Sequence, residues 1–152
     1  MPRRAVAPRC AALVADDVPI AVEEIAGRPR ASSGSPWEPS VGYCRAVRSC
    51  NLITVSGTVG LNADRTYPAT AGEQAARALA IIRAAIEALG GRLEHVVRTR
   101  MFVTDIRRFA AEVGRAHGAV FGGVRPATSM VEVSRLIDDA ALVEIEADAI
   151  VP

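Results

Sequence analysis

Hydrophobic and polar residues alternate with a period of two along two segments near the end of the chain, 125–136 and 142–151. Such alternation predicts strands, because successive side chains of a strand point to opposite faces of the sheet. In the later segment we expect one set of side chains to be buried, namely Val143, Ile145, Ala147, Ala149 and Val151. The other set is expected to point outward, namely Leu142, Glu144, Glu146, Asp148 and Ile150.

The earlier segment offers a second set for the same outward face, namely Thr128, Met130, Glu132, Ser134 and Leu136. The two sets together mix apolar with acidic side chains. A face of this composition is typical of a subunit contact that also lines a polar cleft. We therefore expect a homo-oligomer.

Helical spacing occurs in two places. Thr70 and Glu73 have the spacing of a capping box, and apolar residues then recur three and four apart until Gly90 and Gly91, which predicts a helix over 71–89. A shorter helix is predicted over 107–121, where Phe109, Val113, Ala116 and Val120 form one apolar face.

Further strands are predicted over 43–47 and 52–57, around a turn at 48–51, and over 97–104. Residues 61–69 are expected to form a loop. Two helices that each follow a strand favour an α+β fold of two layers, in which a mixed sheet carries both helices on one face.

The first 30 residues are interpreted as a partly disordered N-terminal extension with a hint of a strand over 18–25, and residues 31–152 as a single domain. The apolar run 11–15 is cut short by Asp16 and Asp17. It is too short for a signal-peptide core or a membrane span, and a transit peptide stays open.

The composition excludes several classes of function. A formal charge of +1, from 18 basic and 17 acidic residues, gives no basic stripe for nucleic acid. Three cysteines, Cys10, Cys44 and Cys50, form no CxxC pair, so we expect a cytoplasmic protein without disulfides. No spacing of histidines and acids predicts a metal site, and no glycine-rich phosphate loop is present. We expect no membrane partner.

Five motifs in their order resemble the RidA/YjgF family of enamine and imine deaminases. They cover residues 40–151 and are Gly42-Tyr43-x-x-Ala46, Asn51-Leu-Ile-x-Val-Ser-Gly57, the helix ending at Gly90-Gly91, Val97 through Asp105, and the final pair of strands. The resemblance implies a chorismate-mutase-like fold that forms a homotrimer, with sheets inside, helices outside and a cleft at each subunit interface. It also implies that no cofactor is used.

The resemblance also implies roles for particular residues. The first glutamate of the family's Glu-Ile-Glu, which activates the attacking water, corresponds to Glu144, and the aromatic residue near the cleft corresponds to Tyr43. Ser56, Gly57 and Thr58 correspond to a segment that lines the pocket. Thr128 stands where the family's Pro-Ala-Arg-Ser motif has the arginine that grips a substrate carboxylate.

A threonine hydroxyl cannot replace the bidentate guanidinium. Arg125 and Arg135 are expected on the opposite face from Thr128, whereas Arg45 and Arg100 remain candidates from neighbouring strands. Without the arginine, a cleft that holds Glu144, and with it Glu132 and Glu146, favours a cationic or non-carboxylate substrate.

Two hypotheses follow. The first is a cofactor-independent enzyme, a deaminase-like hydrolase or a cyclodehydratase, in which Glu144 and Tyr43 act on a C=N bond by hydration, dehydration or tautomerisation. The second is a trimeric ligand-binding protein without catalysis, in which Glu144 and Glu146 are solvated or paired across the subunit interface. RNA cleavage is disfavoured by the charge and the low aromatic content. The expected substrate-binding residues are Thr128, Ser129, Ser56, Gly57, Thr58, Met130, Glu132 and Phe102.

Overall fold

The computed structural model describes residues 18–152, so the disorder predicted for the extension up to residue 17 lies outside the described residues. The elements in chain order are β1 (Ala21–Ile25), β2 (Arg28–Ser32), α1 (Trp37–Val41), β3 (Ala46–Ser49), β4 (Leu52–Val59), α2 (Ala71–Ala88), η2 (Leu93–His95), β5 (Val96–Val103), α3 (Ile106–Phe121), β6 (Ala127–Glu132) and β7 (Val143–Ile150).

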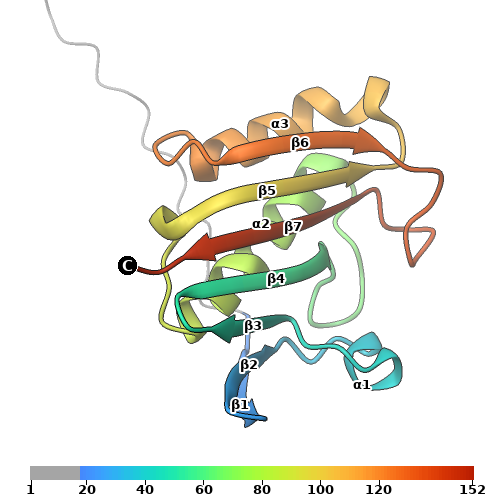
Figure 1. The fold of residues 1–152 in the computed structure, drawn as a ribbon. Coiled ribbons are helices and arrows are strands. Elements are labelled where there is room, and N and C mark those ends of the chain that lie inside the picture. The colour runs from blue at the N-terminus through green and yellow to red at the C-terminus, as the bar shows by residue number, and fades with distance from the viewer. Residues whose placement is uncertain (1–17) are drawn as a thin grey trace, which may run out of the picture.

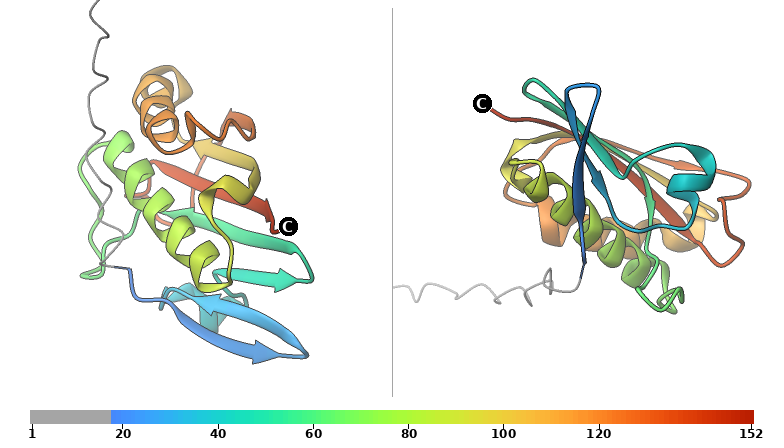
Figure 2. Two further views of the ribbon diagram at one scale, coloured as in Figure 1. Left: turned by 90° about the vertical axis from the view of Figure 1, so that its left-hand side faces the viewer. Right: turned by 90° about the horizontal axis from the view of Figure 1, so that it is seen from below.

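The strands form one mixed sheet in the order β1-β2-β3-β4-β7-β5-β6. Neighbouring strands run antiparallel except β5 and β6, which are parallel and are joined through α3. Helices α2 and α3 cover the same face of the sheet, and in the described part of the chain the other face carries no helix of comparable length (Figures 1 and 2). The predicted α+β two-layer fold is confirmed.

The core lies between the sheet and α2. The inward set predicted for β7 is confirmed, since these residues are at most 8% exposed. Helix α2 begins with the predicted capping box, in which the Thr70 side chain accepts from the Glu73 backbone and the Glu73 side chain accepts from the Thr70 backbone. Its Leu79, Ile82 and Ile86 are buried, so the 3.6-residue period correctly identified the face that packs on the sheet.

The sheet begins at Ala21, ten residues before Ala31, where we expected the domain to start. Strands β1 and β2 form a hairpin whose turn residues Ala26 and Gly27 both have positive φ, and β2 pairs with β3. The strand predicted over 43–47 is shifted, because Tyr43 and Arg45 precede β3. Within residues 18–152 no helix combines the length and the apolar character needed to cross a bilayer.

The face predicted for β6 is wrong. Thr128, Met130 and Glu132 lie in register with Thr99, Met101 and Val103 of the parallel strand β5. Those three β5 residues are buried at 0–3% exposure on the side of the helices, and side chains in register on adjacent strands share a face. The Thr128 set therefore faces the helices, and Ser134 and Leu136 lie beyond the end of the strand.

Candidate active site

A cavity of about 320 Å³ lies beside the ends of β4 and β7 on the face without the long helices. Its walls bring together four residues that the sequence predicted, Glu144, Tyr43, Ser56 and Gly57. The remaining lining residues are Trp37, Val41, Arg45, Val59 and Ile137. This cavity is the candidate active site.

A bulge in β4 makes room for the Glu144 side chain. Val55 pairs with Ala147 but Thr58 pairs with Ile145, so β4 carries one extra residue at Ser56–Gly57. A Cβ atom on Gly57 would lie 1.8 Å from Glu144 Oε1, which means that the carboxylate occupies the space a side chain would need. Bulges change the direction of side chains in this way, and here the bulge lets the Glu144 carboxylate lie directly against the backbone of Gly57.

The surroundings of Glu144 favour its protonated form. Burial and the nearby charge of Glu146 raise the pKa of the Glu144 carboxyl above its usual value of 4.5, and Arg45 opposes them. A raised pKa makes a carboxyl a stronger base and, once protonated, a ready proton donor, as general acid–base catalysis requires. Glu144 therefore has the setting of a general acid and base.

Arg45 is the buried cation of this region, with 4% of its surface exposed. Its Nη2 atom lies 3.4 Å from Glu38 Oε1, and the buried Glu38 also accepts from Ser33. Its Nη1 atom donates to the Gly57 carbonyl at 2.6 Å and to Thr58 Oγ1 at 2.9 Å. The guanidinium therefore fixes the bulge beneath Glu144 but has its own partners already.

Tyr43 is oriented by the same arginine, because Arg45 Nη2 donates to the Tyr43 hydroxyl at 3.2 Å. The hydroxyl accepts in that contact, so its proton can be donated to a ligand. A second phenol, Tyr67, shares the field of Glu144. Burial, Asp138 and Glu144 raise the pKa of Tyr67 to about 12, and its hydroxyl has no hydrogen-bond partner within residues 18–152.

Three other predicted residues lie around this cavity without lining it. Thr58 is buried, and its hydroxyl accepts from Arg45 and donates to the Ser56 carbonyl. Phe102 is in register with Glu144 on the neighbouring strand β5. Ser129 is one strand farther away, in register with Arg100. Phe102 and Ser129 share the open face with Glu144.

Thr128, Met130 and Glu132 are not brought to Glu144 within the chain. Thr128 is hydrogen-bonded to Thr99, whose hydroxyl also lies 2.9 Å from His117 Nε2 on α3. Met130 packs against the core, and Glu132 Oε2 accepts from the backbone of Ile106 at the start of α3. We predicted that Glu132 belongs to the acidic outward face. It instead helps to cap helix α3.

Arg100, the other candidate cation, is committed to acids on β7. Its Nη1 atom lies 3.1 Å from Glu146 and 3.6 Å from Asp148, and all three side chains are partly exposed. Glu146 is therefore paired within the chain. Of the two candidate arginines, only Arg45 reaches the Glu144 cavity.

Trp37, Val41 and Ile137 also line the cavity and were not predicted from the sequence. They come from α1 and from the connection between β6 and β7, and meet only in the folded chain. The chain's single tryptophan was the one hint available. Within residues 18–152 no group of three His, Cys, Asp or Glu side chains could hold a metal ion.

Comparisons with known proteins find relatives that share this fold. The family profile described as Endoribonuclease L-PSP matches residues 34–151. A solved structure from Mycobacterium tuberculosis, described as a member of the YjgF/YER057c/UK114 family, is 48% identical with a TM-score of 0.75 and covers 82% of this chain and 99% of that chain.

Two relatives from Escherichia coli carry functional descriptions. The 2-iminobutanoate/2-iminopropanoate deaminase of strain K12 is 36% identical over 112 residues, which are 71% of this chain and 86% of that protein. The structure of TdcF with bound serine is 25% identical with a TM-score of 0.67 and covers 72% of this chain and 87% of that chain.

Proposed function

The chain belongs to the YjgF/YER057c/UK114 family, the family described as Endoribonuclease L-PSP, and we propose that it is an enzyme that hydrolyses small imines and enamines. The observation that carries the proposal is Glu144, a half-buried carboxyl with a raised pKa that lies over the Gly57 bulge beside Tyr43. Deaminase activity in a relative of 36% identity supports the same chemistry.

In the proposed reaction Glu144 takes a proton from water as the water oxygen bonds to the imine carbon. It then returns that proton to the nitrogen, which gives a carbinolamine. Finally Glu144 moves the hydroxyl proton of the carbinolamine to the nitrogen as the C–N bond breaks, so that the carbonyl product and the amine leave. Tyr43 donates a hydrogen bond to the substrate. Proton transfer of this kind contributes about 10²–10⁴-fold to rate.

The charges around the cavity favour an imine that is neutral or cationic over one that carries a carboxylate. Among residues 18–152, Arg45 is the only cation that lines the cavity, and it is paired with Glu38 and bonded to backbone and hydroxyl oxygens. Within residues 18–152 no cation lies within 4 Å of the Glu144 carboxylate, although the charge of Arg45 opposes the rise of its pKa. When Glu144 is ionised, the cavity therefore carries a net negative charge. We propose that the replacement of arginine by Thr128 marks a branch of the family with this preference.

Thr128 and Glu144 lie on opposite faces of the same sheet, so a single chain cannot place both on one substrate. They can share a cleft only if β6 of one copy meets the open face of another. The open face carries exposed apolar side chains, Leu52, Ile150 and Val131, which suit such a contact. We propose a homotrimer that builds its site between copies.

The description of the family as endoribonucleases names a different activity. RNA would need cations and stacking rings along an open groove. The chain has a formal charge of +1 and 4% aromatic residues, and the cavity carries a net negative charge when Glu144 is ionised. These properties support small imines over RNA as substrates.

The test compares wild-type protein with Glu144→Gln on matched imines that do or do not carry an α-carboxylate, with release of ammonia as the readout. The expected result is turnover that is faster on the carboxylate-free imines and falls about 10²–10⁴-fold in the variant. Sedimentation must show the same trimer for both proteins. Equal turnover in the variant would remove Glu144 from the mechanism, and ligand binding without turnover would favour a binding protein.

A second experiment restores the arginine. Thr128→Arg is expected to raise turnover on the α-carboxylate imines, because a guanidinium would offer a bidentate partner to the substrate carboxylate from the neighbouring copy. Arg100→Thr/Thr128→Arg serves to show that the new guanidinium, not Arg100, is responsible. No gain from Thr128→Arg would contradict a shared cleft at this position.

A further inference from the structure

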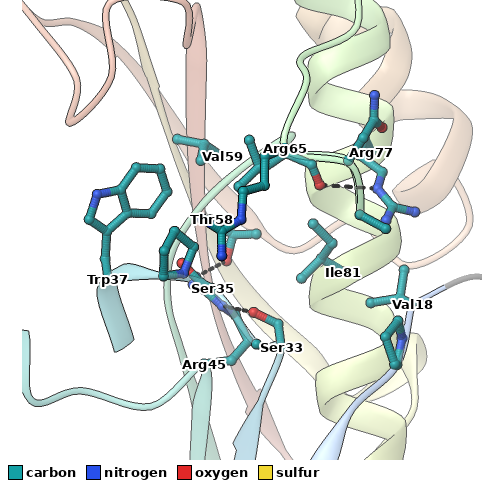
Figure 3. A pocket seen from close by; sticks show the side chains of 16 residues that line it. Val18, Ser33, Ser35, Trp37, Arg45, Thr58, Val59, Arg65, Arg77 and Ile81 are labelled. Carbon is teal, nitrogen blue, oxygen red and sulfur yellow. Dashed lines mark hydrogen bonds between the residues drawn. The ribbon is translucent and has the colours of Figure 1, made fainter. Parts of the chain in front are cut away.

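A second cavity, of about 270 Å³, lies on the other side of Arg45, between α2, the 61–69 loop and the chain that leads into α1 (Figure 3). Its volume is close to the lower end of the range of about 300–1,000 Å³ that is typical of ligand pockets. Val59, Leu61 and Ile81 form an apolar wall, and Trp37 is shared with the Glu144 cavity. The proposed hydrolysis makes no use of this space.

Two arginines give the cavity a positive charge. Arg65 extends from the loop toward Thr58 and Ser35, and Arg77 extends from α2 (Figure 3). Arg77 donates through Nε to the Leu61 carbonyl at 3.3 Å, which leaves both of its terminal nitrogens for a ligand. In the part of the chain that the structure describes, neither arginine has an acidic partner within 4 Å.

No carboxylate lines this cavity in the described residues, and the third arginine, Arg45, is already neutralised by Glu38. Hydroxyls complete the polar side. Ser33 accepts from Arg45, whereas the Ser35 hydroxyl is buried without a hydrogen-bond partner in the described structure. A buried polar group without a partner destabilises the fold, and a ligand that hydrogen-bonds to it would remove that cost.

The loop that carries Arg65 is held by its own hydrogen bonds. Arg65 has a φ of 65°, in the left-handed region that a side chain disfavours. Its backbone N–H donates to the Asn62 carbonyl at 3.0 Å, and Asp64 accepts from the Thr66 backbone at 3.0 Å. The guanidinium is thus presented from a preorganised turn, which lowers the entropy cost of binding.

We propose that this cavity binds a small organic anion that has a carboxylate or phosphate at one end and an apolar body. The anionic end takes hydrogen bonds from Arg65, Arg77 and Ser35, and the apolar body lies against Ile81 and Trp37. Guanidinium groups are suited to both anions, because their paired N–H donors match two oxygens. The two cavities share Trp37, Arg45 and Val59 as walls, but the anion site does not depend on hydrolysis at Glu144.

Trp37 is the only tryptophan in the chain, so its fluorescence reports binding directly. The probes are phenyl phosphate and benzoate, with benzyl alcohol as the uncharged comparison and inorganic phosphate as the anion without an apolar body. At constant ionic strength we expect saturable changes with both aromatic anions, weaker binding of inorganic phosphate and none of benzyl alcohol. The preferred aromatic anion identifies the ligand class. Absence of saturable binding by either would overturn the proposal.

Variants locate the site. Arg65→Gly removes the guanidinium at a backbone position that glycine adopts without strain, so the fold is retained. It is expected to raise Kd about tenfold or more, as is Arg77→Met. Arg83→Met, which alters an exposed arginine of the same helix paired with Glu87, should leave Kd unchanged.

Glu144→Gln separates the two cavities, because Trp37 lines both. Unchanged affinity in this variant, together with weaker binding in Arg65→Gly, supports the anion site. Affinity that responds to Glu144→Gln and not to Arg65→Gly would place the ligand in the other cavity and overturn the proposal.

Discussion

Two clusters of charge lie on neighbouring parts of this sheet and differ in how far they are removed from water. Arg45 and Glu38 are each about 5% exposed, and Arg45 has further partners in Gly57, Thr58 and Tyr43. Arg100 is 38% exposed between Glu146 and Asp148. The buried cluster builds the candidate site, whereas the exposed one pairs charges on an open surface.

The comparison explains why two glutamates two residues apart on β7 differ. Glu146 points to the same face as Glu144 but meets the Arg100 guanidinium at 3.1 Å. Glu144 meets the bare backbone of Gly57, and burial raises its pKa. Position along the strand therefore decides between a paired surface acid and a candidate catalytic acid.

The largest expected effect comes from breaking the buried cluster. Arg45→Met leaves the Glu38 carboxylate buried without its cation and should cost about 3–5 kcal/mol in the free energy of unfolding, measured by urea denaturation. Arg100→Met is the matched control and should cost no more than about 1 kcal/mol, because its pairs are exposed.

The double variant Arg45→Met/Glu38→Gln sharpens this test. Removing the stranded charge should recover part of the loss, because much of the cost of a broken buried pair comes from the unpaired partner. Equal losses of unfolding free energy in Arg45→Met and Arg100→Met would show that the buried cluster contributes no more to stability than the exposed one.

Gly57→Ala should displace the Glu144 carboxylate without removing it. The new Cβ would meet Oε1 at 1.8 Å, so the side chain must move, and we expect turnover of an imine substrate to fall about 10²-fold or more. Gly114→Ala on α3 is the control, because its added Cβ would contact nothing within 4 Å. Wild-type turnover in Gly57→Ala would mean that catalysis does not require the Glu144 carboxylate to lie in the observed position.

Glu146→Gln tests the exposed cluster on the same strand. Turnover should change by no more than about fivefold, since an exposed ion pair contributes about 0–1 kcal/mol. Glu146 helps to raise the pKa of Glu144, so the variant should lower the pKa of the acid limb in a profile of rate against pH. A loss as large as that of Glu144→Gln would assign catalysis to Glu146 as well.

The residues that the sequence placed correctly are those whose neighbours along the chain decide their surroundings. Alternation on β7 and the capping box of α2 are local patterns, and both are observed. Thr128 was placed on the wrong face because β6 is an edge strand with little burial on either side, so no apolar face in its sequence indicates its orientation. Its parallel register with β5 is a long-range property.

The same distinction explains the site. Glu144, Tyr43, Ser56 and Gly57 belong to motifs and were predicted together. Trp37 and Ile137 reach the cavity only through the packing of α1 and of the β6–β7 connection. The hairpin β1–β2 was not predicted in full. Tight hairpin turns with two residues of positive φ usually contain Asn-Gly or Asp-Gly, whereas this turn consists of Ala26 and Gly27.

The smallest expected effect is a change in how stability depends on pH. The folded-state pKa of Glu144 is raised, so between pH 4.5 and that pKa the native state holds more protons than the unfolded state, and stability falls as pH rises. Glu144→Gln removes this contribution, so its Tm relative to wild type should rise across this range and then level off. Glu146→Gln removes only the smaller cause of the raised pKa and should show a smaller rise, and calorimetry from pH 4 to 8 compares the two. Parallel curves for wild type and Glu144→Gln would contradict the raised pKa, and with it the contrast between the two glutamates of β7.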